Sequence, residues 1–519
     1  MIAQRLGLST ALIERGRHPR FAIGESSTPL ANLLLEEICE ESRLPSLRPL
    51  CKWGTWQKNL PRVACGLKRG FTFYHHEFGK RFAPDPEHRK QLLVGASPND
   101  DIADTHWYRA EFDHFLTNEA QNLGVAYWDE TAIVNCQEQD QGLILSGVRR
   151  GSPIEISADF LIDATGPRGF LHRALNLPEK PFHGFPPTQA LFSHFQNVAS
   201  LPASFVADAG PYPPEQAAVH HIFPGGWIWV LKFNNGITSA GVAALDEVAN
   251  ELDFSLGEKA WQRLLERLPS LAEIFGSANA VMPFIHLPRL SFQSEVVASS
   301  RWTMLPSAAG FVDPLLSTGF PLTLLGIKRI ATLLKLGLRH SAFQHGLREY
   351  AVTTKMELET TSRLVSSLYA SMGQFDLFKA LSLLYFAAAS YSETIRRLGK
   401  APSEDGFLLC RHPVFARQLR EICDAAHEPL SEDRNRDLIR SIREAIEPFD
   451  VAGLNDQSRS SWYPAKPSDL LLNSWKLGAT QEEMSALLER CGLKIPALES
   501  AIFSPTRKEQ VGRVLTPPP

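Results

Sequence analysis

Apolar and polar residues repeat with two different periods along the chain. In residues 60–105 and 178–300, short runs such as GFTFYHHEFG, WIWVLKF and TSAGVAAL alternate as half-buried antiparallel strands do. From about residue 331 to 519, segments rich in Leu, Ala, Arg and Glu have the helical period. The pattern therefore predicts an α/β chain whose strands form an antiparallel sheet, with a helical C-terminal region.

The first residues predict the second half of a βαβ nucleotide-binding unit. Met1 to Gly7 reads as a helix that ends at a glycine, and Leu8 to Arg15 reads as a short buried strand. In such a unit, an acid at the end of the second strand, here Glu14, accepts hydrogen bonds from a ribose. We expect the first strand and its GxGxxG turn to be encoded before Met1. The alternative is an ordinary helix and strand that bind no nucleotide.

Composition excludes several other classes of protein. The 519 residues contain 53 Lys and Arg against 57 Asp and Glu, which argues against a nucleic-acid partner. Seven cysteines without a CxxC pair favour the reducing cytoplasm. The longest largely apolar run, residues 381–391, is too short to span a membrane. The pairs His75-His76 and His220-His221 lack metal-ligand spacing and are expected on loops or strand ends, so no metal site is predicted. The basic pair Arg396-Arg397 is expected on a solvated helix face.

Three segments before residue 170 have the composition of cofactor-binding loops. Residues 23–29 read IGESSTP, in which Gly24 lets the backbone approach a ring or a phosphate. The segment WYRAEFDHFLTNEA predicts a helix that carries Arg109 and Asp113, for which the alternative is a surface ion pair. A third segment is a strand that ends in DATG, where Gly166 permits close backbone packing.

A fourth segment, LPSAAGFVDPLLSTGFPLTLLGIK, spans residues 305–328. Gly310, Pro314 and Gly319 interrupt a loop that leads into a helix starting near Thr318. The free amides at a helix N-terminus stabilise negative charge and can hold a small anion. The segment therefore predicts an anion-binding loop.

Together these segments resemble the motifs of flavin-dependent halogenases, which are tryptophan-halogenase-like FAD-dependent oxidoreductases. The resemblance covers residues 1–330. It implies the two-dinucleotide-domain flavoprotein fold of the aromatic-hydroxylase type. Residues 1–330 would form the FAD-binding domain with its inserted β-rich substrate subdomain, and residues 331–519 a helical C-terminal domain. The sheet of residues 178–300 would form the floor of the substrate cavity.

The resemblance also implies the residues that bind cofactors. The FAD-binding positions are Glu14, Arg15, Gly24, Glu25, Ser26, Arg109, Asp163, Gly166, Gly310, Asp313, Pro314 and Ser317. The backbone at Thr318 and Gly319, within the motif FxxPxxSxG, would bind the halide beside the flavin.

For catalysis, the resemblance points to Lys68 in the segment KRGFTF. Its ammonium group would receive hypohalous acid and direct the halogen to an aromatic carbon, whereas the alternative is a solvated lysine at a strand end. Trp227 and Trp229 match a WxWxIP motif, although Leu231-Lys232 replaces Ile-Pro. They would form a wall of the substrate cavity, whereas the alternative is a pair of core aromatic side chains.

Departures from the motifs narrow the substrate. Leu316 stands where tryptophan-specific members carry a glutamate, and Pro306-Ser307 replaces the usual Gly-Asp. The expected substrate is therefore a phenol- or pyrrole-like aromatic molecule, free or on a carrier protein, halogenated with O2, halide and reduced FAD from a separate flavin reductase. Two alternatives remain, namely an FAD-dependent monooxygenase or dehydrogenase acting at the flavin, and a truncated non-catalytic homologue that serves as a binding partner.

Overall fold

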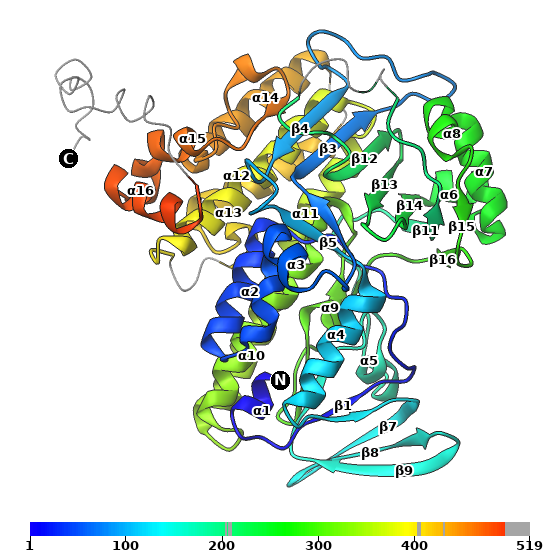
Figure 1. Cartoon of the computed structure of the whole chain (residues 1–519), viewed down its shortest axis with the longest axis vertical. Coiled ribbons are helices and arrows are strands. Elements are labelled where there is room, and N and C mark those ends of the chain that lie inside the picture. Colours follow the sequence, from blue (N-terminus) through cyan, green and yellow to red (C-terminus); the bar gives the residue numbers. More distant parts are fainter. Residues whose placement is uncertain (203–204, 206–209, 402–405, 429–430, 494–519) are drawn as a thin grey trace.

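The computed structural model describes residues 1–202, 205, 210–401, 406–428 and 431–493 (Figure 1). In the view of Figure 1, the N-terminal part lies below, a large sheet lies above it, and the C-terminal helices lie at the upper left. The expected α/β class with a helical C-terminal region is confirmed. No helix in the described part of the chain is long and apolar enough to cross a membrane.

The lower part is built on two parallel strand pairs. β1 (Ala11–Ile13) pairs with β6 (Ala126–Trp128), and β10 (Leu161–Asp163) pairs with β18 (Trp302–Met304). An antiparallel sheet completes this part, with strands β7 (Thr131–Gln139), β8 (Gly142–Arg149) and β9 (Ser152–Ala158).

The expectation that the first strand is buried was wrong. Leu12 of β1 is 38 % exposed, although Leu8 and Ile13 pack partly against the core. The reason is that β1 pairs along one edge with β6 and, among the described residues, has no second neighbouring strand. A strand in the middle of a parallel sheet would be covered on both faces and paired along both edges.

The large sheet has nine strands from distant parts of the chain. Its order is β15-β11-β14-β13-β12-β3-β4-β20, with β16 also paired to β11. The strands are β3 (Gly70–His75), β4 (Gln91–Gly95), β11 (Thr188–Gln196), β12 (Ala218–Phe223), β13 (Gly226–Lys232), β14 (Thr238–Leu245), β15 (Asn279–Ala280), β16 (Ile285–Leu287) and β20 (Trp462–Tyr463). One face packs on α6 (Asp246–Leu252), α7 (Glu258–Arg267) and α8 (Pro269–Phe275), at the right of Figure 1.

Two further pairs of short strands are antiparallel. β2 (Cys65–Lys68) pairs with β5 (Asp104–Trp107), and β17 (Phe292–Gln293) pairs with β19 (Gly310–Phe311). His220 and His221 do not lie on a loop or strand end as expected, but are buried within β12. The Nδ1 atom of His221 lies 2.9 Å from Nε2 of His76, so these two ring nitrogens are hydrogen-bonded to each other in the core.

Helices enclose the rest of the core. The longest are α10 (Gly319–Leu336), α11 (Ser341–Ser371) and α12 (Phe375–Arg397), and α10 packs between α2 and α11. The others are α1 (Ile2–Arg5), α2 (Pro29–Glu41), α3 (Trp53–Asn59), α4 (Arg109–Asn122), α5 (Phe170–Ala174), α9 (Pro306–Ala309), α13 (Pro413–Ala426), α14 (Glu432–Ile446), α15 (Pro467–Leu472) and α16 (Gln481–Arg490). The division expected near residue 330 falls inside α10, and it stays a prediction.

Candidate active site

The loop that contains Gly24 is held by α4. Arg109, the first residue of α4, donates from Nη1 to the backbone carbonyls of Ile23 at 3.1 Å and Gly24 at 2.9 Å. Its Nε and Nη2 atoms donate to the carboxylate of Asp113 at 2.7 and 2.8 Å. Arg109 and Asp113 are therefore more than a surface ion pair, because together they fix the backbone of the Gly24 loop.

The next residue of this loop, Glu25, points into the protein. Its side chain is buried, and Oε1 lies 2.8 Å from Nε2 of His194 on β11. The other carboxylate oxygen, Oε2, is also buried and has no hydrogen-bond partner among the described residues. A buried acceptor without a donor is costly, so this oxygen is available to a ligand.

The second expected loop is shaped by a buried carboxylate. Asp313 accepts a hydrogen bond from the amide of Leu315 at 2.9 Å and one from the hydroxyl of Tyr369 at 2.8 Å. Burial raises the pKa of Asp313 to about 7. Further along the same loop, Leu316 and Ser317 both have positive φ, at 65° and 56°. Such strain in non-glycine residues persists only where tertiary contacts hold it, and it concentrates at functional sites.

The loop ends at the N-terminus of α10, as the sequence predicts. Thr318 is the N-cap residue and Gly319 the first helical residue. The first amides of a helix have no acceptor within the helix, and Pro321 contributes no N–H group. Thr318 is buried whereas Gly319 is exposed, and a Cβ atom on Gly319 would meet no atom within 4 Å. Backbone donors therefore border open space at the positions predicted to bind a halide.

Lys68 joins the two loops. Its ammonium group donates to the carbonyl of Ser27 at 2.5 Å, to the hydroxyl of Ser26 at 2.9 Å and to that of Ser317 at 3.5 Å. It also lies 3.8 Å from the centre of the Phe71 ring. Lys68 is fully buried, and burial lowers its pKa to about 7. The expected alternative of a solvated lysine at a strand end is therefore wrong.

Asp104 is a residue of this site that the motif analysis missed. The antiparallel pairing of β2 with β5 sets Asp104 directly opposite Lys68. Burial raises the pKa of Asp104 to about 7, and the charge of Lys68 opposes that rise. The sequence does show an acidic residue at the start of the short segment DTHW. It does not show which strand pairs with this segment.

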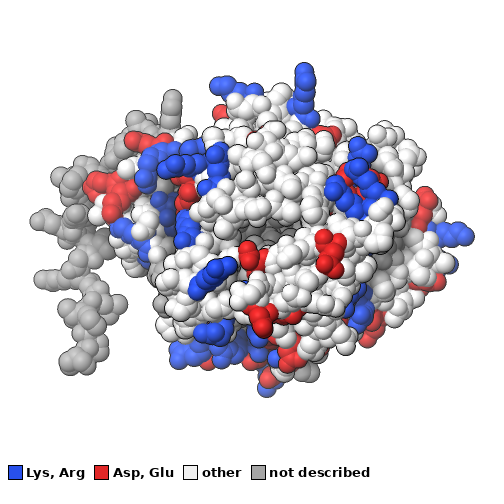
Figure 2. All heavy atoms as spheres, turned by 90° about the horizontal axis from the view of Figure 1, so that it is seen from below, with Lys and Arg blue, Asp and Glu red and all other residues white. Residues whose placement is uncertain are grey.

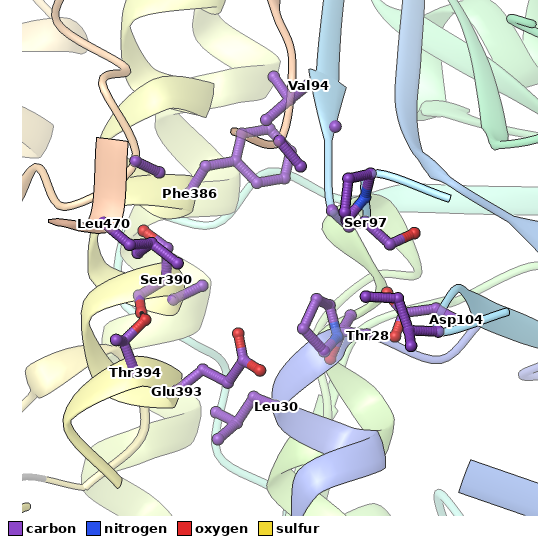
Figure 3. A pocket seen from close by; sticks show the side chains of 18 of the residues that line it. Thr28, Leu30, Val94, Ser97, Asp104, Phe386, Ser390, Glu393, Thr394 and Leu470 are labelled. Carbon is purple, nitrogen blue, oxygen red and sulfur yellow. Dashed lines mark hydrogen bonds between the residues drawn. The ribbon is translucent and has the colours of Figure 1, made fainter. Parts of the chain in front are cut away.

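A cavity of about 210 Å³ lies beside this pair. It is formed by the start of α2, the end of β4 and α12, and Figure 3 shows Asp104 and Ser97 across it from Ser390 and Glu393 of α12. Phe71 and Asp104 line the cavity, and Lys68 lies beside both residues. The sheet contributes to this cavity through β3 and β4 and not through the described part of residues 178–300. That residues 178–300 form the floor of the substrate cavity stays a prediction.

Trp227 and Trp229 do not line this cavity. Both are buried in β13, where their ring centres lie 5.6 Å apart. The indole of Trp227 donates to the hydroxyl of Tyr369 at 3.2 Å, which links it to Asp313 in the second loop. Their role as a cavity wall stays a prediction, since this position also suits core aromatic side chains.

The remaining expected cofactor residues lie at the lower parallel strands. Glu14 follows β1, and its carboxylate accepts from the amide of Gly16 at 2.7 Å and from Arg20 at 2.8 Å, whereas Arg15 is exposed. Gly166 has φ of +82°, and a Cβ atom there would meet nothing within 4 Å. Gly310 differs, because a Cβ atom would lie 2.6 Å from the side chain of Leu358 on α11. Gly310 is thus required by helix packing.

Asp163 shapes the turn after β10. Its carboxylate accepts hydrogen bonds from the amide and hydroxyl of Thr165, at 2.8 and 2.6 Å, and from the amide of Leu171 at 2.8 Å. We expect Asp163→Ala to lower the free energy of unfolding by about 2–4 kcal/mol, because the buried amide of Leu171 loses its acceptor and the turn at Thr165 loses two hydrogen bonds. Urea unfolding would measure this, with the exposed Asp159→Ala as the control. Equal stability of the two variants would contradict the assignment.

The described residues fit an FAD molecule. Backbone at Gly24, Gly166 and Gly319 borders open space, except that the guanidinium of Arg109 lies 3.6 Å from the Cβ position of Gly24. Small residues that expose backbone in this way let an extended cofactor approach closely. The unpartnered Oε2 of Glu25 supplies an acceptor at the same loop. The residues that would hold FAD therefore lie in the loops around Gly24, Gly166 and Ser317.

Basic residues of α12 form ion pairs with carboxylates of α12 and α2. Arg397 contacts Glu393 at 2.6 Å and Glu36 of α2 at 3.2 Å, and Arg396 contacts Glu37 at 2.8 Å. The expectation that Arg396-Arg397 forms a solvated helix face was wrong, because α2 packs against α12 and supplies these carboxylates. On the face seen in Figure 2, acidic and basic side chains are interspersed around a hollow.

The chain matches known proteins over most of its length. The family described as "Tryptophan halogenase" matches residues 103–377. The monodechloroaminopyrrolnitrin halogenase PrnC of Pseudomonas fluorescens is 27 % identical over 72 % of this chain and 66 % of its own length. The tetracycline 7-halogenase of Kitasatospora aureofaciens is 26 % identical over 94 % of this chain and 92 % of its own length.

A solved structure shares the fold. The crystal structure of the halogenase PltM in complex with phloroglucinol and FAD has a TM-score of 0.76 and 23 % identity, and the match covers 88 % of this chain and 95 % of PltM. The fold is thus the FAD-binding fold of these enzymes, as the motifs imply. Since the tryptophan halogenase family matches residues 103–377, more than half of the chain, the chain belongs to this family of FAD-dependent enzymes.

Proposed function

We propose that this chain halogenates an electron-rich aromatic small molecule of the phenol or pyrrole class. The observation that carries the proposal is the position of Lys68. Its ammonium group contacts both loops that border the cofactor site and lies beside Phe71 and Asp104 of the cavity. The overall reaction exchanges a ring hydrogen for a halogen, so that Ar–H and HOX give Ar–X and water.

When bound, reduced FAD supplies, together with O2 and a halide ion, the oxidising power that yields HOX. The chain's own residues hold the halide and bind the oxygen of HOX. Backbone amides at Thr318 and Gly319 hold the halide without a cationic side chain, since no Lys or Arg lies between Leu305 and Ile327. The ammonium of Lys68 donates a hydrogen bond to the oxygen of HOX, which makes the halogen more electrophilic toward the ring.

The substrate class follows from the second loop and from the relatives. Leu316 is fully buried, and its carbonyl accepts a hydrogen bond from the hydroxyl of Tyr385 at 3.0 Å. Because this residue is a leucine, the loop offers no carboxylate at this position. The two relatives are named for monodechloroaminopyrrolnitrin and tetracycline, which are aromatic molecules. We infer an aromatic substrate other than free tryptophan, presented as a free small molecule or on a carrier protein.

We also propose a source of the reduced cofactor and a cellular compartment for the chain. A separate flavin reductase would deliver reduced FAD to the chain. The seven cysteines all lie in the described part of the chain and form no disulfide bond there, which supports a reducing cytoplasm.

The decisive experiment supplies the purified chain with reduced FAD, air and either chloride or bromide. Simple phenols and pyrroles are offered free and, in a second arm, attached to a carrier protein. We expect a product whose mass and isotope pattern change with the halide supplied. A hydroxylated product that forms without halide would instead establish the monooxygenase alternative, and absence of bound flavin would establish the non-catalytic one.

Activity should depend on pH through Lys68. Burial lowers the pKa of Lys68 to about 7, and the reaction needs the charged form. Since an amine loses its charge as pH rises through its pKa, we expect kcat/KM to fall about tenfold for each pH unit above that value. A series of initial rates at constant ionic strength would test this. A flat profile up to pH 9 would show that the ammonium form is not required.

A further inference from the structure

Two unpartnered acceptor oxygens lie at one side of the cavity. The Nδ2 atom of Asn32 donates to Oδ1 of Asp104 at 2.7 Å. Oδ1 of Asn32 and Oδ2 of Asp104 are buried and have no hydrogen-bond partner among the described residues. Both residues line the cavity, and both are more than nine-tenths buried. Buried acceptors of this kind are normally satisfied, so the cavity offers them to a donor on a ligand.

The surroundings of these acceptors specify the ligand. Phe71, Tyr385 and Phe386 supply aromatic and apolar lining, which suits a flat ring. The charged groups that influence Asp104 are Lys68 of β2 and, from α12, Glu393 and Arg397, and the last two are paired with each other at 2.6 Å. The ammonium of Lys68 already lies opposite Asp104 and lowers its pKa, so a neutral N–H or O–H donor fits better than a second cation.

We propose that Asp104 and Asn32 accept a hydrogen bond from the ring O–H or N–H group of the aromatic substrate and thereby orient the ring toward Lys68. This inference rests on the proposed function and adds the group that the site recognises. Asp104 lies opposite Lys68 in the β2–β5 pair, so a ring anchored at Asp104 presents its carbon atoms near the ammonium. An acceptor next to a phenol or pyrrole donor also raises the electron density of the ring. The site would therefore select rings by their donor group.

The test compares rings with and without the donor. A phenol and its methyl ether, and a pyrrole and its N-methyl derivative, are halogenated by the wild-type chain and by Asp104→Asn. We expect the wild type to prefer the donor of each pair by at least tenfold in kcat/KM, because a buried acceptor left unpaired is costly. In Asp104→Asn the preference, taken as the ratio of the two kcat/KM values, should fall to about twofold or less, whatever the change in the absolute rates. Asp100→Asn, an exposed carboxylate paired with Arg69, is the matched control.

Two further measurements separate the possible failures. Calorimetric binding of the phenol and its ether to the chain without turnover should show the same preference, independent of halogenation. In the pH profile, Asp104→Asn should move the loss of activity to lower pH, because the carboxylate raises the pKa of Lys68.

An equal loss for both rings in Asp104→Asn, or a wild type without preference, would overturn the inference while leaving halogenation intact. Failure of the proposed function would instead appear as no halogenated product from any ring. If Asp104→Asn does not fold, the calorimetric comparison of the phenol and its ether on the wild-type chain still decides.

Discussion

Replacing Lys68 with methionine is expected to reduce halogenation by at least about 100-fold while reduced FAD is still reoxidised. The reason is a division of roles, since the two loops hold the cofactor and the halide, whereas the ammonium of Lys68 presents the oxidant to the ring. Loss of a positioned proton donor typically lowers a rate by about 10²–10⁴-fold. Product formation is followed by chromatography, and cofactor reoxidation by its visible absorbance.

The fold should tolerate this substitution. Methionine retains the long apolar stem that packs near Phe71, and the hydroxyl groups of Ser26 and Ser317 can bond to water. Asp104 loses a neighbouring cation, but its pKa is already raised to about 7, so the carboxyl group takes up a proton. Lys232→Met is the control, because Lys232 at the end of β13 also pairs with a carboxylate, that of Glu215, at 2.9 Å. Wild-type halogenation by Lys68→Met would contradict the assignment.

The loops of the site could be predicted because their chemistry is local. The turn at Gly24, the N-cap at Thr318 and the start of α10 are each specified by neighbouring residues, and the structure places them as expected. Lys68 was singled out in advance only through the resemblance to the family's lysine, which also precedes a strand of this kind. Its burial and its contact with Ser317 could not be predicted, because these residues are 249 positions apart.

The residues that the sequence did not reveal depend on contacts between distant segments. Asp104 becomes a partner of Lys68 only through strand pairing, and Asn32 reaches it from α2. Arg397 was expected on a solvated face, because the sequence of α12 does not show that Glu36 of α2 lies against it. His221 was expected on a loop or a strand end for a similar reason, since its partner His76 directly follows β3, the strand that pairs with β12.

Replacing Gly319 with valine should remove the response of bound FAD to chloride and weaken FAD binding about tenfold. Gly319 is the first residue of α10 and is exposed, and its φ lies outside the left-handed region. A Cβ atom there would meet no protein atom within 4 Å. The branched side chain would therefore occupy the open space that borders the first amides of the helix, where the halide is proposed to bind.

This geometry makes the experiment specific to the ligand. Because the protein itself has room for the side chain, the melting temperature should change little, whereas a halide at the amides would be displaced. Gly373→Val is the matched control, since a Cβ atom at Gly373 also meets nothing within 4 Å and the residue follows α11. Chloride is titrated into each protein with bound FAD while the flavin fluorescence is recorded. An unchanged chloride response in Gly319→Val would place the halide elsewhere and would favour chemistry at the flavin itself, since the helix N-terminus would then hold no anion.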